Sequence, residues 1–467
     1  MLVKKSAGRD LSSMKSYQFP AHDLPLDDSW DVIVAGGGPA GCTAAAAAAR
    51  EGAKTLLIES TGSLGGMGTS ALVPAWCPFS DKEKMIYRGL GEKILKECIA
   101  GSPHVKKDAL DWVPISPELL KRIYDDLVTS SGARVLFQTQ LSAVQRRDDQ
   151  INTIVVTNKS GLTAYRAKVF VDCTGDADLC AWAGVEFHKG NEKGEKLMPA
   201  THCFTLTNVD EYAFQHGPSM FGGHADCPVH AIIKSGRYPL IPDAHLCCII
   251  VGPRTVGFNA GHLWNIDNTK PETVSAALIE GRKMAEQYRA ALAEFHPKAF
   301  GNAYLVMTGS LMGIRETRRI VGEYELTLDD YLQRRSFPDE ICRNSYFIDV
   351  HWAKEEVATK FEDWEARCMH YGKGESHGIP YRCLVPKGLD NALVAGRSIS
   401  CEQIVQGSVR VMPVCLAMGE AAGMAAAMAA TSYKSRVRNV PVDLLRARLL
   451  KMGAYLPEVP ASQSGSP

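Results

Sequence analysis

The pattern Gly-x-Gly-x-x-Gly at Gly36, Gly38 and Gly41 constrains the fold of this chain more than any other feature. It follows an apolar run at residues 32–35 and opens an alanine-rich stretch, after which a second apolar run covers residues 56–58. This order predicts a strand, a helix and a second strand. In such a unit the first glycine permits a tight turn, the second lets the backbone approach a pyrophosphate, and the third lets helix and sheet pack closely. The pattern therefore predicts a dinucleotide site.

Glu59 directly follows the second apolar run. A carboxylate at this place can accept hydrogen bonds from both hydroxyls of an adenosine ribose, and it would repel a 2′-phosphate. Glu59 therefore favours a dinucleotide without that phosphate.

Three further glycine segments favour FAD over NAD. Leu64 to Thr69 form a second glycine-rich loop within ten residues of Glu59, where it can run beside the ribityl chain and the flavin edge. Strand-like runs also end in turns at residues 174–176 and 396–397. Remote segments that converge on one site are hard to explain by packing alone, so we expect bound FAD.

The chain length predicts more than one domain. With 467 residues, 45% of them hydrophobic, the chain is too long for one ordinary domain, and two closely packed domains are expected. Short alternating runs between Val135 and Val171 predict antiparallel hairpins.

We therefore expect an α/β fold, in which a mixed α+β substrate domain is inserted into a Rossmann-like FAD-binding domain with a parallel sheet and an antiparallel meander. The expected ranges are 28–75, 130–185 and 388–435 for the FAD-binding domain, 76–129 and 186–387 for the substrate or cap domain, 1–27 for an N-terminal extension and 456–467 for a disordered tail.

Charge and cysteine content exclude several classes of protein. The 52 lysines and arginines balance the 52 aspartates and glutamates, so no global field draws the chain to nucleic acid or to an anionic membrane, and a small-molecule partner is expected. The 14 cysteines form no Cys-x-x-Cys pair, which argues against an iron–sulfur cluster, a zinc knuckle or the commonest redox disulfide, and we expect no metal. The first thirty residues contain no apolar run, so we expect neither a secretory signal nor a membrane span, and a cytoplasmic location.

The sequence resembles the FAD-dependent oxidoreductases with the glutathione-reductase-type flavin fold, and in particular the broad FAD-dependent oxidoreductase family. The resemblance spans about residues 31 to 430 and is carried, in the family's order, by DVIVAGGGPAGCTAA, SLGGMGTSALV, FVDCTGDADLCAWAG, GIRETRRIVGEYELT, YRCLVPKGLDNALVAGRSIS and GSVRVMPVCLAMGEAAG.

This resemblance implies a pyrophosphate over the Gly36 to Gly41 loop, a ribose on Glu59, and a flavin near Gly66, Gly396 and Arg410. A helix that begins near Pro413, with Arg410 beside its start, would also place positive potential near the flavin. The complete set expected to bind FAD is Gly36, Gly38, Pro39, Ala40, Gly41, Glu59, Ser60, Gly65, Gly66, Thr69, Thr174, Gly175, Asp176, Gly396, Arg397 and Arg410.

Non-covalent FAD and hydride transfer are the expected chemistry. The Gly65 to Thr69 loop holds no histidine for covalent attachment, and the chain has no second dinucleotide motif for NAD(P)H. Aromatic hydroxylases usually place a Gly-Asp-Ala-Ala-His-like turn where this chain has Ala395 to Ser398, so hydroxylation is the lesser alternative. We expect a dehydrogenase or oxidase of a small polar metabolite, such as a sugar or another hydroxylated compound. The alternatives are a redox sensor or electron-transfer subunit that needs a protein partner, or a flavin monooxygenase; the electron acceptor stays open, as does a homo-oligomer.

Four residues, with three weaker ones, are candidates for catalysis. His351 follows a strand-like segment and carries an imidazole suited to base chemistry near neutrality, although a lone histidine is more often structural. Arg315 and Arg318 could anchor a carboxylate or a polyol, although pairing with a neighbouring glutamate would explain them equally well. Tyr381 is a weaker candidate, as are His377, Glu402 and His202.

Overall fold

The computed structural model describes residues 17, 23–191, 196–351 and 370–457, so most of the expected N-terminal extension and of the expected tail lies outside it. The predicted βαβ unit is present as β1 (Leu26–Ala35), α1 (Pro39–Arg50) and β2 (Thr55–Ile58). β1 and β2 are parallel, and both are fully buried where they pair, as expected from their continuous apolar runs. Pro39 occupies the first turn of α1, where its missing N–H leaves no bond unmade.

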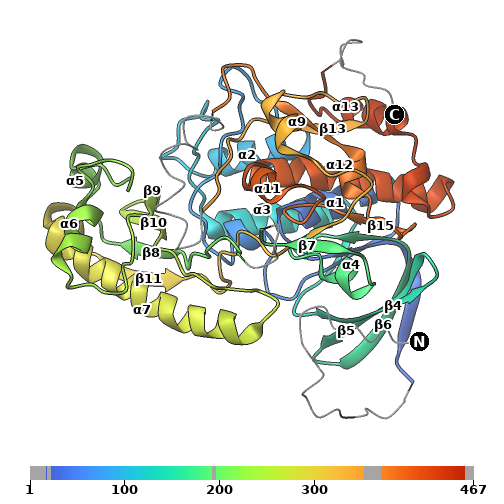
Figure 1. The fold of residues 1–467 in the computed structure, drawn as a ribbon, viewed down its shortest axis with the longest axis horizontal. Helices are drawn as coiled ribbons and strands as arrows, with labels where there is room; N and C mark the ends of the chain where they lie inside the picture. Colours follow the sequence, from blue (N-terminus) through green and yellow to red (C-terminus); the bar gives the residue numbers. More distant parts are fainter. Residues whose placement is uncertain (1–16, 18–22, 192–195, 352–369, 458–467) are drawn as a thin grey trace.

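β1 lies in the middle of a seven-stranded sheet of order β3-β2-β1-β6-β5-β4, in which β15 also pairs with β6. β15, β6, β1, β2 and β3 run parallel, whereas β4, β5 and the first half of β6 form an antiparallel meander (Figure 1). The expected parallel sheet with a meander is thus confirmed. The bounds are β3 Arg134–Leu136, β4 Gln140–Arg147, β5 Gln150–Asn158, β6 Gly161–Asp172 and β15 Ala392–Val394.

Helix α12 (Met412–Ser432) packs directly on α1. A Cβ atom on Gly419 would lie 2.1 Å from the Ala40 carbonyl oxygen, and one on Gly423 would lie 2.0 Å from that of Ala44. The two backbones therefore touch. α12 is long and apolar enough to cross a membrane by length and composition, but 89% of its most apolar window is buried inside the protein, as in a core helix.

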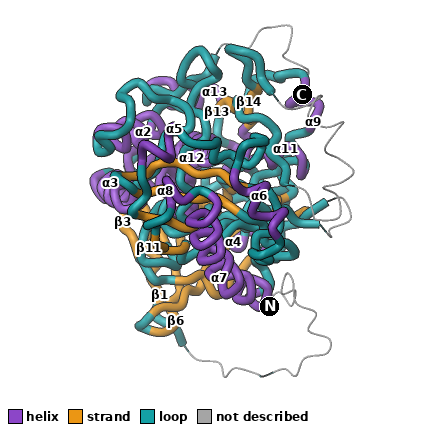
Figure 2. The backbone as a smooth tube through the Cα atoms, turned by 90° about the vertical axis from the view of Figure 1, so that its left-hand side faces the viewer, coloured by secondary structure: helices purple, strands orange, loops and turns teal. Residues whose placement is uncertain are grey.

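A second sheet, of order β11-β8-β10-β9, is antiparallel throughout. The long helix α7 packs on it, and Phe204, Phe258 and Tyr288 lie in the shared core. Figure 1 shows this unit beside the first one, and Figure 2 shows α7 on its outer side. The bounds are β8 Phe204–Thr207, β9 Leu246–Gly252, β10 Thr255–Ala260, β11 Tyr304–Thr308, α5 Glu211–His216, α6 Pro228–Ser235, α7 Pro271–Phe295 and α8 Pro297–Phe300.

The hydrophobic cores divide the chain differently from the expected domain ranges. The core around the second sheet is built from residues 200–314, a shorter stretch than the expected 186–387. Residues 76–129 and 326–385 supply buried side chains to the core that contains α1 and α12. The sequence of α3 (Pro117–Ser130) shows that this helix has an apolar face, but it does not show which element the face packs against. In the structure this face packs against α1.

The remaining elements lie outside these two sheets. Their bounds are α2 Leu90–Ala100, α3 Pro117–Ser130, α4 Asp178–Trp182, β7 Phe187–Lys189, β12 Arg318–Ile320, α9 Leu328–Leu332, β13 Glu340–Asn344, β14 His377–Pro380, α11 Gln403–Val409 and α13 Val442–Lys451, with short 3-10 turns η1 Gly66–Gly68, η2 Tyr381–Leu384 and η3 Val437–Asn439.

Gly423→Ala tests the contact between α1 and α12. Alanine is the better helix former by about 1 kcal/mol, but its Cβ would meet backbone atoms that cannot move aside. We expect a net loss of about 1–3 kcal/mol in the free energy of unfolding, measured by urea denaturation. Gly91→Ala in α2 is the matched control, because its Cβ would meet nothing closer than 3.7 Å. Equal stability of the two variants would contradict a close backbone contact.

Candidate functional site

A cavity of about 2290 Å³ extends from the glycine loop to the second sheet. Residues from both cores line it, including Gly38 and Glu59 at one end and Cys247 and Asn259 on the strands of the second sheet. A dinucleotide bound over the glycine loop would therefore reach into a space that the second sheet closes.

The three motif glycines differ in their backbone conformation and surroundings. Gly36 has φ of +93°, and a Cβ there would lie 2.4 Å from the Cys173 carbonyl oxygen. A Cβ on Gly41 would lie 1.8 Å from the Gly36 carbonyl oxygen. In contrast, a Cβ on Gly38 would meet nothing within 4 Å, because this glycine faces the cavity. The open side of the loop is the side that a pyrophosphate would approach.

Glu59 lies at the cavity edge, 8% exposed, and it braces the same loop. Its Oε2 accepts a hydrogen bond of 2.7 Å from the Gly37 N–H, and its Oε1 accepts one of 2.6 Å from the Thr61 N–H. The Ser60 hydroxyl also donates to Oε1 over 3.3 Å. A carboxylate has about four acceptor positions, so one remains for a ribose hydroxyl. Ser60 lines the cavity beside it.

Some residues of the second glycine loop face the cavity, and others support the loops by hydrogen bonds. Gly66 lines the cavity, whereas Gly65 and Thr69 do not. The Gly65 N–H donates to the Gly37 carbonyl over 2.8 Å, and the Thr69 hydroxyl donates to the Leu64 carbonyl over 2.6 Å. Of the residues predicted to bind the cofactor, Gly41, Gly65 and Thr69 thus shape the loops instead of facing the cavity.

The turns after β6 and β15 meet across the cavity wall. The Arg397 Nη2 donates to Asp176 over 2.9 Å, next to Gly175. Burial favours the neutral form of Asp176, but the Arg397 guanidinium and hydrogen bonds outweigh it and lower the pKa of this carboxyl. Thr174, Gly175, Asp176, Gly396 and Arg397 all line the cavity.

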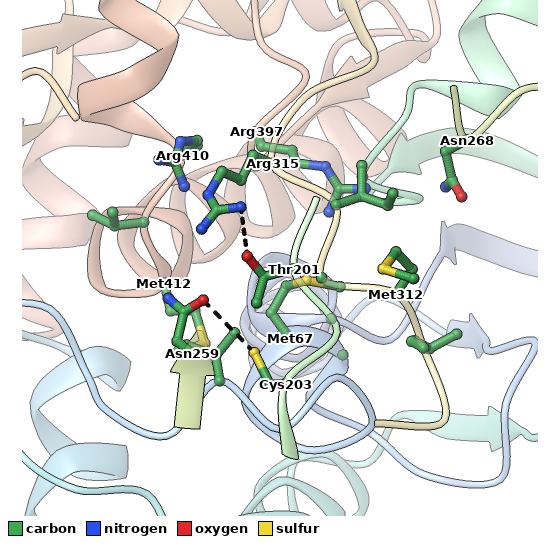
Figure 3. A pocket seen from close by; sticks show the side chains of 18 of the residues that line it. Met67, Thr201, Cys203, Asn259, Asn268, Met312, Arg315, Arg397, Arg410 and Met412 are labelled. Carbon is green, nitrogen blue, oxygen red and sulfur yellow. Dashed lines mark hydrogen bonds between the residues drawn. The ribbon is translucent and has the colours of Figure 1, made fainter. Parts of the chain in front are cut away.

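Two arginines in this wall each have a buried N–H group that no described residue accepts. Figure 3 shows Arg397 and Arg410 among the lining side chains, and the Nε atoms of both are buried without a hydrogen-bond partner in the described protein. Arg410, which precedes α12, donates through Nη2 to Asp349 over 2.8 Å and 3.1 Å. The open face of Gly38, the free capacity of Glu59 and these unpaired donors fit a dinucleotide whose flavin carries carbonyl acceptors.

Arg315 is buried in the cavity lining (Figure 3). Its Nη1 donates to the Pro199 carbonyl over 2.8 Å and to the Thr201 hydroxyl over 3.0 Å, and its Nη2 lies 3.5 Å from the His245 Nε2. Burial and the nearby Arg410 lower the pKa of Arg315 to about 10, so it stays charged near neutral pH.

Arg318 also lines the cavity but faces the turn after β6. It donates to the Asp176 carbonyl over 3.0 Å and forms an ion pair of 2.7 Å with Asp178. Its neighbours Glu316 and Arg319 pair with each other, as the structural alternative predicted. Arg318 thus lies at the cofactor end of the cavity.

His351 reaches the cavity, although no strand delivers it, since β13 ends at Asn344. Its Nδ1 lies 2.8 Å from the His262 Nε2, and its Nε2 lies 3.3 Å from Asp349. The expected pKa near neutrality is wrong, because burial and then the Arg315 charge lower the pKa of His351 to about 3.

Tyr381 does not line the cavity. Its side chain is buried in η2, and its hydroxyl donates to the Val437 carbonyl over 2.8 Å, so we no longer retain it as a catalytic candidate. His377, Glu402 and His202 also lie outside the cavity lining.

Sequence reasoning missed His245 and His262, which line the cavity beside His351. His245 precedes β9 and His262 follows β10, and these strands pair with Leu246 opposite Ala260. The signal was the hairpin register, which brings the two histidines to the same end of the hairpin.

Two curated proteins are similar to part of this chain. The digeranylgeranylglycerophospholipid reductase of Methanocaldococcus jannaschii is 28% identical over 194 residues, 40% of this chain and 47% of the relative. The reductase of the same name from Picrophilus torridus is 27% identical over 175 residues, 34% of this chain and 43% of the relative. The matches therefore span less than half of these relatives.

Among solved structures, the anhydrotetracycline hydroxylase OxyS from Streptomyces rimosus has a TM-score of 0.46 at 15% identity, over 91% of this chain and 66% of that one. A geranylgeranyl bacteriochlorophyll reductase-like protein from Thermoplasma acidophilum has a TM-score of 0.44 at 13% identity, over 92% and 84%. The model of the family described as FAD dependent oxidoreductase matches residues 31–449, so the chain belongs to this family and FAD is confirmed as its cofactor.

Proposed function

We propose that this oxidoreductase transfers hydride between a small, polar, hydroxylated metabolite and non-covalently bound FAD. When bound, FAD supplies the two-electron chemistry, and the protein supplies binding, orientation and electrostatics. The cavity is large enough for both partners, because it continues past the loops that would hold the cofactor to the second sheet.

The observation that carries this proposal is the charge of Arg315. It is buried and cationic, and among the described residues no carboxylate lies within ion-pair distance of its guanidinium. Its contacts to Pro199 and Thr201 use Nη1 and fix its orientation. A buried cation without a direct counter-ion is costly unless a ligand completes its surroundings. A substrate carboxylate or a pair of hydroxyls would do so by charge-assisted hydrogen bonds.

The proposal includes hydride transfer in either direction between the substrate and FAD. The curated relatives are named as reductases, and reduction of a substrate is the reverse of its dehydrogenation on the same site. Arg315 holds the polar part of the substrate in either direction, while His351 forms part of the wall beside it.

An anaerobic reduction screen tests the proposed function. The purified protein carries FAD that acid denaturation releases, and metabolites with hydroxyl or carboxylate groups are added in turn while the flavin absorption is followed. Bleaching by one of them supports the proposal. Reduction by NAD(P)H followed by reoxidation by a metabolite would support transfer in the reverse direction. Reduction by NAD(P)H with reoxidation only by oxygen would favour a monooxygenase, and reduction only by a protein partner would favour an electron-transfer role; either of these two results would overturn the proposal.

Glu59→Gln tests the ribose contact. The change removes a charged acceptor worth about 1.5–3 kcal/mol, while the amide oxygen can still accept from the Gly37 N–H. We expect FAD affinity to fall by about tenfold or more, as measured by titration of the apoprotein, and the thermal transition of that apoprotein to fall slightly, because the amide nitrogen cannot accept the hydrogen bond from the Thr61 N–H. Unaltered affinity would remove Glu59 from the binding site.

Arg315→Lys tests the substrate anchor. Lysine keeps the charge but loses the planar fork of donors, so we expect the KM of the substrate found in the screen to rise by about 10- to 100-fold. FAD content is expected to stay at the wild-type level. Arg343→Lys is the matched control, because Arg343 is a buried arginine paired with Glu340 away from the cavity. An equal effect of both changes on KM would show that Arg315 acts only through stability.

A further inference from the structure

Three histidines from separate segments converge on the cavity wall. His245 precedes β9, His262 follows β10 and His351 follows the segment after β13, and each can offer one ring nitrogen within 4.8 Å of the other two. The His245 and His262 rings are stacked with centroids 4.1 Å apart, and the His351 ring stands edge-on to both at 5.1 Å and 5.0 Å.

Two carboxylates orient the rings of this histidine cluster. Asp243 lies 2.9 Å from the Nδ1 of His262, and Asp349 lies 3.3 Å from the Nε2 of His351. A carboxylate accepts a hydrogen bond, so the Nδ1 of His262 carries the proton of its neutral ring. The Nε2 of His262 is then left with its lone pair.

This lone pair faces the Nδ1 of His351 at 2.8 Å, and one ring donates a hydrogen bond to the other at that distance. Two nitrogens that bind one tetrahedral Zn²⁺ at about 2.0–2.1 Å lie roughly 3.3 Å apart, so the two rings would separate slightly on binding. Neutral imidazole is the form that binds metals.

We propose that His245, His262 and His351 bind one divalent transition-metal ion of the zinc class through their ring nitrogens. Three imidazoles suit Zn²⁺ and its neighbours in the first transition row, whereas Mg²⁺ and Ca²⁺ prefer oxygen ligands. A carboxylate on the far nitrogen of a ligating histidine is the usual support of such a site, and both Asp243 and Asp349 have this position.

The charged groups around the cluster, in the part of the chain that the structure describes, are two carboxylates and two arginines. Arg315 opposes a dication, with its Nη2 3.5 Å from His245, and Arg410 lies beyond Asp349. Asp243 and Asp349 supply two negative charges in direct contact with the rings. Three protein ligands also leave a coordination position that can take an oxygen of water or of a substrate. The binding of a substrate oxygen at this position rests on the proposed function. A substrate hydroxyl would then lie between the ion and Arg315.

Metal binding by the FAD-loaded full chain tests the site. The protein is stripped with a chelator, dialysed, and titrated with Zn²⁺ in competition with a chromophoric zinc indicator. We expect one equivalent to bind, and X-ray absorption at the zinc edge to show nitrogen or oxygen ligands at about 2.0–2.1 Å. His262→Gln and His351→Gln are expected to lower the affinity at least 100-fold, and Asp243→Asn about 10- to 100-fold.

His230→Gln is the matched control, because His230 is exposed and lies outside the cluster. Flavin content and the near-ultraviolet circular dichroism spectrum report whether each variant is folded, and Asp243→Asn keeps the test valid if a histidine variant does not fold. The proposal is overturned if the wild type binds no stoichiometric Zn²⁺, or if the cluster variants bind it as tightly as His230→Gln.

The metal titration needs no substrate, so its outcome is independent of the reduction screen. Bound zinc without any metabolite that bleaches the flavin would leave the metal site standing and remove the proposed function. The reverse result would remove only the metal site.

Discussion

The backbone contact between α1 and α12 is the constraint on which the rest of the structure depends. It exists because Gly419 and Gly423 have no side chain to separate the helices from each other. The contact seats the start of α12 beside the start of α1, where Arg410 and Met412 join the cavity lining. A glycine loop alone would make a nucleotide site open to water, whereas the second helix gives it a wall.

Buried charge is distributed unevenly along that wall. Asp176 pairs with Arg397, Asp178 with Arg318 and Asp349 with Arg410, so these segments are tied to one another where the cofactor would lie. Burial and the neighbouring Asp176 raise the pKa of Asp178 to about 6 in spite of its arginine. Paired charges of this kind hold segments in place, since breaking one pair would strand a buried ion.

The cofactor end of the cavity could be predicted because its signals are local in the sequence. Gly36, Gly38 and Glu59 belong to one strand–helix–strand unit, and the turn after β6 follows its strand without interruption. Each role follows from the residue type and from its position at a strand end. Gly65 and Thr69 show the limit of this reasoning. A loop residue can face the ligand or support the loop, and the amino-acid sequence of the loop is the same in both cases.

The far end of the cavity could not be predicted in the same way. Tyr381 was a candidate because it is a polar aromatic residue, but its hydroxyl donates a hydrogen bond to the carbonyl of Val437, which is remote in the sequence. His351 looked like a base of ordinary pKa, and its pKa depends on burial and on Arg315. Desolvation and charge act through space, so the pKa of a residue cannot be predicted from its own segment of the sequence.

The sequence by itself determined the dinucleotide loop, the acid that follows it and the class of sheet, because short-range periodicity and glycine stereochemistry dictate these features. Only the tertiary structure decided which chain segments share a core and which side chains meet at the cavity. His245, His262 and His351 come together because a hairpin and a distant loop pack side by side. Contacts of this kind depend on how whole elements bury their apolar faces, and many arrangements satisfy the same local pattern.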